Sequence, residues 1–333
     1  MKNSFNKILL PLILMFLVGC NSNKESESIS DIASEKVDFS SLKILSPQGA
    51  PAVAFYNYSD NNNYTTNATP SNIVASMSEK SDIDVVVIDT VSGIKAINNG
   101  APYKMAATIT FGNFYIAATG NDDNSVMDND DTIVLFGQNQ TPDYIFNYLY
   151  GTENFSNIEY VTAVSDAAKC LITGKNSVTG STVDYVFVAQ PVLYNALNNK
   201  NAATYGKASV YKDIQKEYEE KSNNKKMIQA SVFVKTTDTS SEYTAKIDAF
   251  LNSLEKDINA VISNPELVVN GFNKVSSEEA TAKYSIPGMV AKAVLSENNG
   301  LGLGYQKALT IKDQIDAFIN LFGQKVTNEN IYY

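Results

Sequence analysis

The sequence of 333 residues contains no arginine, histidine or tryptophan, and all 26 of its basic residues are lysines. Histidine is the usual general base at neutral pH and the commonest zinc ligand, so its absence argues against an enzyme and against a zinc site. Arginine clamps carboxylates and phosphates with two parallel hydrogen bonds, and that clamp is missing too. We therefore expect a protein that binds without catalysing a reaction, and we expect no cofactor and no metal.

Basic charge is also scarce, because 36 acidic residues stand against 26 lysines and the formal net charge is −10. Removal of residues 1–19 would take away two lysines and no acid, which leaves 24 lysines against 36 acids and a net charge of −12. Nucleic acid is therefore excluded as a partner, since binding it requires a basic surface.

Cysteine occurs only twice, at Cys20 and Cys170. Cys20 follows two lysines, the apolar run 8–18 and a glycine, a pattern typical of a signal peptide whose apolar part is too short to span a membrane. The pattern also resembles the bacterial lipoprotein signal, which implies that Cys20 carries lipid and attaches the exported chain to the outer face of the cell membrane. We expect residues 1–19 to be removed and residues 20–40 to form a flexible tether. Cys170 is then expected to be a buried, inert thiol without a disulfide partner.

Short runs of strand-forming residues alternate with segments of helical periodicity from Ser41 onward. Continuous apolar runs such as 83–88 are typical of strands buried on both faces, and starts such as Thr141-Pro142-Asp143 are typical of helices. The alternation predicts an α/β fold with doubly wound mixed sheets. We expect strands at 42–45, 83–88, 103–111, 114–118, 132–136, 158–161, 185–188 and 227–234, and helices at 52–58, 167–172, 243–262, 277–284, 289–296 and 311–322, with further helices starting near residues 69, 89, 141 and 190.

The exported length of roughly 310 residues exceeds what one hydrophobic core usually supports, which predicts two lobes. The strands near 105–116 and 227–234 are placed to carry the chain from one lobe to the other and back. We assign residues 41–110 and 233–333 to lobe 1 and residues 111–232 to lobe 2. Such an arrangement leaves a ligand cleft between the lobes that a hinge motion can close.

The stretch 84–118 contains an apolar strand that ends in a polar pair, a helix that closes in Gly-Ala-Pro-Tyr, and a strand with a Gly-Asn break. In these features it resembles the type II periplasmic-binding-protein superfamily, in particular its nitrate, sulfonate, taurine and thiamine-precursor binders. The resemblance implies that two-lobed fold, a small-molecule ligand, and the permease and ATPase subunits of an ABC importer as partners; we expect a monomer. Further stretches match in order and spacing at 42–51, 137–146, 188–192 and 229–235.

Many oxyanion binders of that superfamily hold their ligand with arginine, histidine or tryptophan, which this chain lacks. A neutral or heteroaromatic solute, stacked on tyrosine or phenylalanine and hydrogen-bonded by asparagine, glutamine and threonine, fits the composition better. The preferred ligand is a vitamin or precursor such as riboflavin or a thiamine-type pyrimidine. The alternatives are a sulfonate- or nitrate-type anion, and a sensor lipoprotein that does not transport. An enzyme of the thiamine-precursor-synthase type shares the fold but would need histidine or cysteine clusters.

Ligands of open α/β sheets bind at the carboxyl ends of the strands, so the loops that follow strands are the places to look for binding residues. Thr141 could also cap the helix that it begins, and Asp89 could either cap a helix or bind a ligand amine. Phe111 could stack on a ring or belong to the core. The predicted ligand-binding residues are Gln48, Asp89, Thr90, Phe111, Asn113, Asn139, Gln140, Thr141 and Gln190.

Two further patterns suggest sites that their residues do not support. The acidic run 121–131 leads to Ile133 where a calcium-binding EF-hand loop needs glycine, and to Gln140 where it needs glutamate. We expect a solvated hairpin turn there. The glycines of 300–304 do not have dinucleotide-binding spacing, and we expect a flexible connection.

Overall fold

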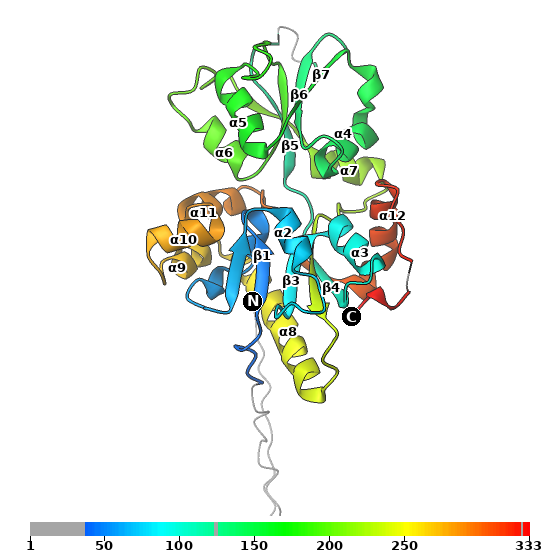
Figure 1. Ribbon diagram of the computed structural model, residues 1–333. Helices are drawn as coiled ribbons and strands as arrows, with labels where there is room; N and C mark the ends of the chain where they lie inside the picture. The colour runs from blue at the N-terminus through cyan, green and yellow to red at the C-terminus, as the bar shows by residue number, and fades with distance from the viewer. Residues whose placement is uncertain (1–36, 123–125, 328) are drawn as a thin grey trace, which may run out of the picture. The chain divides into compact units, whose positions relative to one another are not determined.

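The computed structural model describes residues 37–122, 126–327 and 329–333 (Figure 1). The predicted signal peptide at 1–19, the predicted lipidation site Cys20 and most of the predicted tether lie outside the described residues. Within the described part of the chain, no helix has both the length and the apolar character needed to cross a membrane.

The folded body begins earlier than predicted. Phe39, which the sequence assigns to the tether, packs its ring edge-on against Phe250 with 6.1 Å between the ring centroids. The ring is partly buried against the hydrophobic core, so Phe39 belongs to the fold.

Six strands form the first sheet, in the spatial order β11 (Leu303–Lys307), β4 (Tyr103–Thr110), β10 (Ala230–Lys235), β3 (Val85–Asp89), β1 (Ile44–Pro47) and β2 (Tyr64–Asn67). β1 is parallel to β2 and β3, whereas β10 is antiparallel to β3 and β4, and β11 is antiparallel to β4. The interior strands are mostly apolar; the first four residues of β3 are fully buried, as expected of a strand covered on both faces.

Five strands form the second sheet, in the order β7 (Asn157–Val161), β6 (Thr132–Phe136), β8 (Tyr185–Ala189), β5 (Phe114–Ala118) and β9 (Ser209–Asp213). β6 is parallel to β7 and β8, and β5 is antiparallel to β8 and β9. Both sheets are therefore mixed, which confirms the predicted α/β class.

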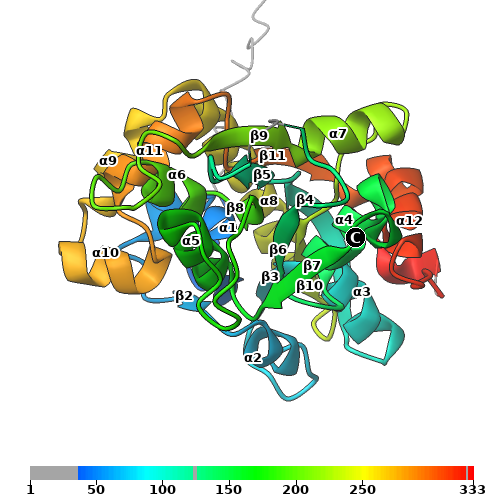
Figure 2. The same cartoon turned by 90° about the horizontal axis from the view of Figure 1, so that it is seen from above.

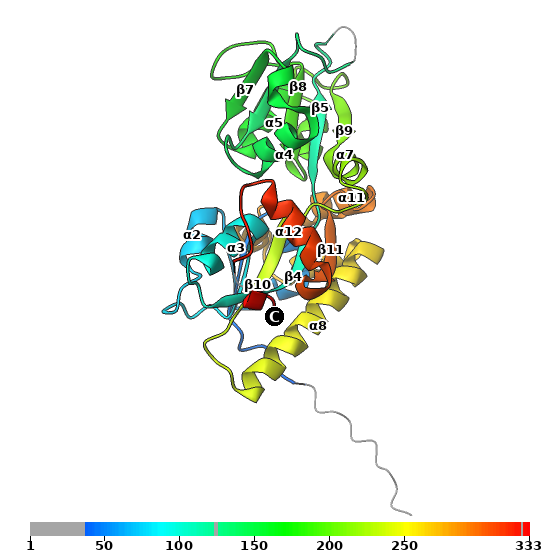
Figure 3. The same cartoon turned by 90° about the vertical axis from the view of Figure 1, so that its right-hand side faces the viewer.

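Helices cover both faces of the six-stranded sheet (Figure 3). One face packs against α1 (Ala50–Val53), the 3-10 turn η1 (Tyr56–Tyr58), α8 (Ser241–Ser263), α9 (Glu266–Phe272), α10 (Ser277–Tyr284) and α11 (Gly288–Ser296). The other face packs against α2 (Pro70–Ala75), α3 (Thr90–Asn98), η3 (Ala308–Ile311) and α12 (Lys312–Asn320). The predicted helix at 52–58 is thus two short pieces, α1 and η1.

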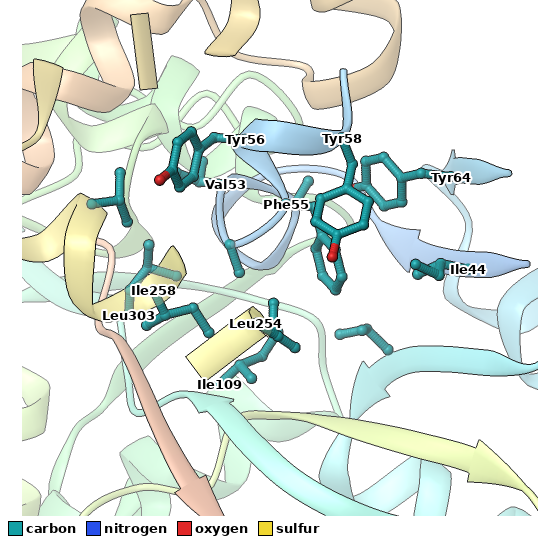
Figure 4. Packing of buried hydrophobic residues seen from close by; sticks show 14 of the residues in the cluster. Ile44, Val53, Phe55, Tyr56, Tyr58, Tyr64, Ile109, Leu254, Ile258 and Leu303 are labelled. Atoms are coloured by element: carbon teal, nitrogen blue, oxygen red, sulfur yellow. The ribbon is translucent and has the colours of Figure 1, made fainter. Parts of the chain in front are cut away.

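The long helix α8 follows directly from its sequence pattern. The Ser240 hydroxyl accepts a hydrogen bond from the Tyr243 amide at 3.2 Å and caps the start of the helix. Apolar residues then recur every three or four positions and place one stripe against the sheet. Figure 4 shows Leu254 and Ile258 of this stripe among side chains of α1, η1 and the strands. The buried residues of the stripe are Ile247, Phe250, Leu251, Leu254, Ile258 and Val261.

The five-stranded sheet is also covered on both faces (Figure 2). α5 (Val164–Thr173) and α6 (Val192–Leu197) pack on one face, and α4 (Thr141–Tyr150) and α7 (Ile214–Lys221) pack on the other. The second of these faces belongs to a hydrophobic cluster that continues onto the six-stranded sheet, since the cluster contains both Phe187 of β8 and Phe233 of β10.

The chain passes between the two sheets twice. β4 leads through residues 111–113 into β5, and the return path runs from α7 through residues 222–229 into β10. The lobe boundary predicted between residues 232 and 233 falls within β10, all of whose residues pair in the six-stranded sheet.

Three strands, β2, β9 and β11, have no counterpart among the predicted elements, and each lies at the edge of its sheet. An edge strand pairs on one side only and is less buried, so it lacks the apolar run that identifies an interior strand. The flexible connection predicted at 300–304 is wrong for the same reason, because Leu303 and Gly304 begin β11. The amide of Phe111 donates to the carbonyl of Gly302 at 2.8 Å and holds the turn before this strand.

Candidate functional site

The parallel strands of each sheet end at one edge. In the six-stranded sheet, β3 ends at Asp89, which pairs with Ala230, the first residue of the antiparallel β10. Gln229, just before β10, therefore lies at the edge where the parallel strands end. In the five-stranded sheet, β8 ends at Ala189, which pairs with Phe114, the first residue of β5. The segment that leads into β5 thus lies beside the residue that follows β8.

The side chains of Gln229 and Asn113, together with the backbone of Gln190, join the two edges. The Nε2 of Gln229 donates to the Oδ1 of Asn113 at 2.9 Å, and the Nδ2 of Asn113 donates to the backbone oxygen of Gln190 at 3.0 Å. The backbone N–H of Gln190 donates to the backbone carbonyl of Asn113 at 2.9 Å, and the side-chain Oε1 of Gln190 accepts from the backbone N–H of Tyr194 at 3.0 Å. Asn113 and Gln190 are both buried. The structure therefore brings these two predicted residues into direct contact, and Gln229, which the sequence analysis missed, bonds to Asn113 from the other sheet.

Asp89 and Thr90 lie at the start of α3, beside this network. The Oδ1 of Asp89 accepts from the Ser92 amide at 2.9 Å, which confirms the capping role. Burial raises the pKa of the half-buried Asp89 carboxyl, against hydrogen bonds from Ser92 that lower it. Thr90 is fully buried, and its amide donates to the Gln229 carbonyl at 3.1 Å. Asp89, Thr90, Asn113 and Gln190 thus share one edge region.

Buried hydroxyls form a row at this edge, from the first residue of α3 across β10 to β4. The Oγ1 of Thr90 lies 2.6 Å from the Oγ of Ser231, which lies 3.1 Å from the Oγ1 of Thr108. Thr110, at the end of β4, is also buried, but its Oγ1 has no partner within the described residues. The hydrogen bonds of the row satisfy three hydroxyls that would otherwise be costly to bury, and the Thr110 hydroxyl has no partner within the described residues.

Gln48 lies apart from this row. Its Nε2 donates to the carbonyl of Ala282 at 2.7 Å, and its Oε1 accepts from the hydroxyl of Ser285 at 2.9 Å. Both ends of the amide thus tie the loop after β1 to the end of α10. A ligand would have to compete with these bonds to engage Gln48.

Three predicted residues lie in the loop before α4 and at the first position of α4, and their side chains are exposed or partly exposed. Asn139 and Gln140 are exposed, and Thr141 is half-buried. Gln140 is the N-cap residue of α4, since its carbonyl accepts the first helical bond, from Tyr144; the cap predicted for Thr141 is wrong. No side chain caps α4; Asp143 instead accepts from the Asn139 amide at 2.8 Å.

Phe111 has the placement of a core residue. Its ring is buried in the cluster shared by the two sheets, and the Nζ of Lys226 lies 5.4 Å from the ring centroid. A ligand could stack on this ring only after Lys226 moved.

The acidic run 121–131 falls partly outside the described residues, and within the described ones no group of three or more acidic, cysteine or histidine side chains could hold a metal ion. Asp131 is buried; its Oδ2 accepts from the Asp128 amide at 2.6 Å, and burial raises the pKa of its carboxyl to about 6. Cys170 is buried as predicted, and burial raises the pKa of its thiol.

A pocket of about 200 Å³ lies beside α12, away from these residues. It is lined by Asp316, Asn320, Lys325 and Val326. None of the predicted binding residues contributes to it, and we give it no part in the site.

The residues that the sequence analysis missed at the edge are Thr108, Thr110, Gln229, Ser231 and Gln306. A search limited to the residues that follow strands cannot find Gln229, because it precedes an antiparallel strand. A usable signal was nevertheless present, since hydroxyl residues interrupt the otherwise apolar β4 and β10. Polar residues inside buried strands need partners, and they mark positions where polar groups gather.

No protein-family model matches the sequence, and no curated protein matches it. Solved structures do match. An ABC transporter protein from Parabacteroides distasonis is 16% identical, with 85% of this chain and 92% of that chain covered and a TM-score of 0.64. The periplasmic aliphatic sulphonate binding protein SsuA from Escherichia coli is 13% identical, with 85% and 91% covered and a TM-score of 0.59. The alkanesulfonate-binding protein SsuA from Xanthomonas axonopodis pv. citri, bound to MOPS, is 11% identical, with 85% and 92% covered and a TM-score of 0.53.

Proposed function

We propose that this chain, which has the type II periplasmic-binding-protein fold, is the solute-binding subunit of a bacterial ABC importer and acts as a monomer without catalysis. The observation that carries the proposal is the meeting of the two sheet edges at Asn113, where the chain crosses between the sheets. In open α/β sheets, ligands bind where strands end, and here two such edges are joined by a short segment. A solute held between them would touch both lobes.

The two crossings would act as the hinge. We propose that each sheet with its helices moves as one lobe, and that residues 111–113 and 222–229 absorb the change in backbone angles. Asn113 bonds to residues of both edges, so it would keep the edges in register while the lobes close. Closure around a solute is the signal that a permease can recognise.

We propose a neutral or heteroaromatic solute, with riboflavin or a thiamine-type pyrimidine as the preferred examples. The side chains at the edges are amides, hydroxyls and a carboxylate, and arginine and histidine are absent from the whole chain. Amides and hydroxyls recognise the edges of heterocycles through paired donors and acceptors.

A sulfonate is the second candidate solute. It is favoured by the likeness to two structures that are described as binding sulfonates. Since identity to both is low, that likeness speaks for the fold, and we rank the anion below the heterocycle.

Thermal-shift measurements on the exported chain test the proposal, with flavins, thiamine, its pyrimidine precursor, ethanesulfonate and nitrate as probes. A solute present at a hundred times its dissociation constant should stabilise the protein by about 2.7 kcal/mol. A shift with one heterocycle would support the preferred solute, and a shift only with ethanesulfonate or nitrate would replace it by the anion. The absence of any shift would contradict both candidates.

We further propose that Cys20 carries the lipid that anchors the chain to the outer face of the membrane. Cys20→Ser removes the thiol that would be acylated and should release the protein from the membrane fraction. Fractionation followed by immunoblotting measures the effect, with Cys170→Ser as the matched control, since Cys170 is buried in the fold. A Cys20→Ser chain that stayed in the membrane fraction would contradict the anchor.

A further inference from the structure

Unsatisfied hydrogen-bond acceptors gather at the edge of the six-stranded sheet. Five buried side-chain atoms lack a hydrogen-bond partner within the described residues. Three of them belong to the last residue of β4, to the residue before β10 and to the neighbouring strand β11. These three are the Oγ1 of Thr110, the Oε1 of Gln229 and the Oε1 of Gln306. A buried polar atom without a partner costs stability, so a cluster of them indicates a group that the bound state supplies.

The strand register places two of these residues, Thr110 and Gln229, next to the residue that pairs with Asp89. Ala230 pairs with Asp89 on one side and with Thr110 on the other, and Thr110 also pairs with Leu303 of β11. Gln229 precedes Ala230, and its carbonyl accepts from the amide of the residue after Asp89. We call this group, Asp89, Thr110 and Gln229, the β10 edge. Gln306 lies two rungs along β11 from the same point, opposite Thr108.

The carboxylate of Asp89 has no cationic partner. None of the ion pairs within the described residues includes it, and the groups that lower the pKa of Asp89 are the amide and hydroxyl of Ser92. Asp213 shows the contrast, because this second N-cap aspartate, at the end of β9, lies 3.5 Å from the Nζ of Lys216. Lys226 lies over the ring of Phe111, with its Nζ 5.4 Å from the ring centroid.

This combination discriminates between classes of solute. An anion would meet the half-buried carboxylate of Asp89 and the glutamine carbonyl oxygens, which cannot donate to it, and only the Thr110 hydroxyl could. An amine would donate a charge-assisted hydrogen bond to Asp89, which is stronger than a neutral one, and its remaining N–H groups could reach neutral acceptors. The edge is therefore built for hydrogen-bond donors.

We propose that the solute carries an amino or ammonium group, and that the β10 edge receives it, with Asp89 as the charged acceptor and Gln229 and Thr110 as neutral ones. The inference rests on the proposed solute-binding function and names the chemical class of its solute. It assigns an amino-substituted heterocycle or another compact amine to the site and disfavours anions that carry no amino group.

Calorimetric titration tests the inference with a matched pair of probes, 4-amino-5-hydroxymethyl-2-methylpyrimidine and its 4-oxo counterpart, together with thiamine, putrescine, riboflavin and ethanesulfonate. Asp89→Asn keeps a side chain that caps helices well but removes the charge and adds a donor. We expect it to weaken binding of an amine probe at least tenfold and to reduce or reverse the preference for the amino over the oxo pyrimidine. Asp213→Asn is the control and should change affinity less than twofold.

The outcomes separate the two claims. Binding of riboflavin or ethanesulfonate with equal affinity in the wild type and in Asp89→Asn would overturn the inference and leave the solute-binding function standing. An amine that binds both variants equally well would do the same. If no probe bound, the solute class would be wrong together with the function proposed for this site. The melting temperature of ligand-free Asp89→Asn should not fall below that of the wild type, so that a loss of affinity cannot be ascribed to unfolding.

Discussion

The hydroxyl row of Thr90, Ser231 and Thr108, beside the β10 edge, is satisfied by its own hydrogen bonds, whereas the loop before α4 in the five-stranded sheet is exposed. In the row, Thr90 and Ser231 are buried and hydrogen-bonded to each other. In the α4 loop, residues 137–141, Asn139 and Gln140 are exposed, and the Gln140 side chain makes no cap bond. In the proposed function, the hydroxyl row is the pre-organised side of the site and the loop before α4 is the side that adapts to the solute.

The largest effect should come from two glycines with the same backbone conformation. Gly302 (φ +64°) and Gly137 (φ +68°) both lie in the left-handed region, but a Cβ on Gly302 would lie 2.0 Å from the carbonyl oxygen of Gly112, whereas a Cβ on Gly137 would meet only the Gln140 side chain, at 3.1 Å. Gly302→Ala should lower the free energy of unfolding by about 3 kcal/mol or more, and Gly137→Ala by about 1 kcal/mol. Urea unfolding measures both. Equal losses would show that the two edges are packed alike.

The second effect concerns the hydroxyl row. Ser231→Ala removes the partner of the buried Thr90 and Thr108 hydroxyls and should cost about 1–3 kcal/mol of unfolding free energy. Gln140→Ala, in the open loop, should cost less than about 0.5 kcal/mol. Ser231→Thr, which keeps the hydroxyl, should lose less unfolding free energy than Ser231→Ala in the same denaturant titration. An equal loss in Gln140→Ala and Ser231→Ala would contradict the difference between the two regions.

The smallest effect is a pH dependence of stability that arises from Asp89. Burial holds the pKa of Asp89 above its usual range, so the folded protein binds a proton at Asp89 more tightly than the unfolded chain does. Below the pKa of Asp89 in the unfolded chain, Asp89 is protonated in both states and does not affect stability. As the pH rises from that value to the raised pKa of the folded state, the unfolded chain loses its proton first and the free energy of unfolding falls. Asp89→Asn should therefore match the wild type near pH 4 and exceed it in melting temperature at pH 7 to 8.

The matched substitution Asp213→Asn should act in the other direction. It removes a charged cap that lies 3.5 Å from Lys216, and it should lower stability at neutral pH by under about 1 kcal/mol. Melting temperatures measured across pH check both variants. A loss of stability in Asp89→Asn at neutral pH would indicate that the Asp89 charge stabilises the ligand-free fold, contrary to the inference about its role.

Much of the architecture was predictable from local patterns. The strand at 132–136, the helix at 277–284 and the capping role of Asp89 agree with the structure residue for residue. Interior strands and capped helices carry signals within a few residues of chain. The edge strands β2, β9 and β11 carry no such signal, since one side of each is unpaired and their residues are polar.

The candidate site was predictable only in part. The strand-end rule found Asp89, Thr90, Asn113 and Gln190, which the structure joins, but it also selected Gln48, whose amide is tied to the end of α10. The sequence could not show that tie, because Gln48 and its partner Ala282 are 234 residues apart. Pairings of that kind depend on the packing of α10 against β2 and α1.

The sequence by itself determined the α/β alternation, the acidic charge and the absence of arginine and histidine, because periodicity, composition and charge are properties of the chain alone. Only the tertiary structure decided which polar side chains share an edge, which of them satisfy one another and which are left without a partner. The antiparallel β10 brings Gln229 beside Asp89, although the two are 140 positions apart in the chain. Burial and partner identity arise from such long-range strand pairing, and they convert ordinary threonines and glutamines into a candidate binding edge.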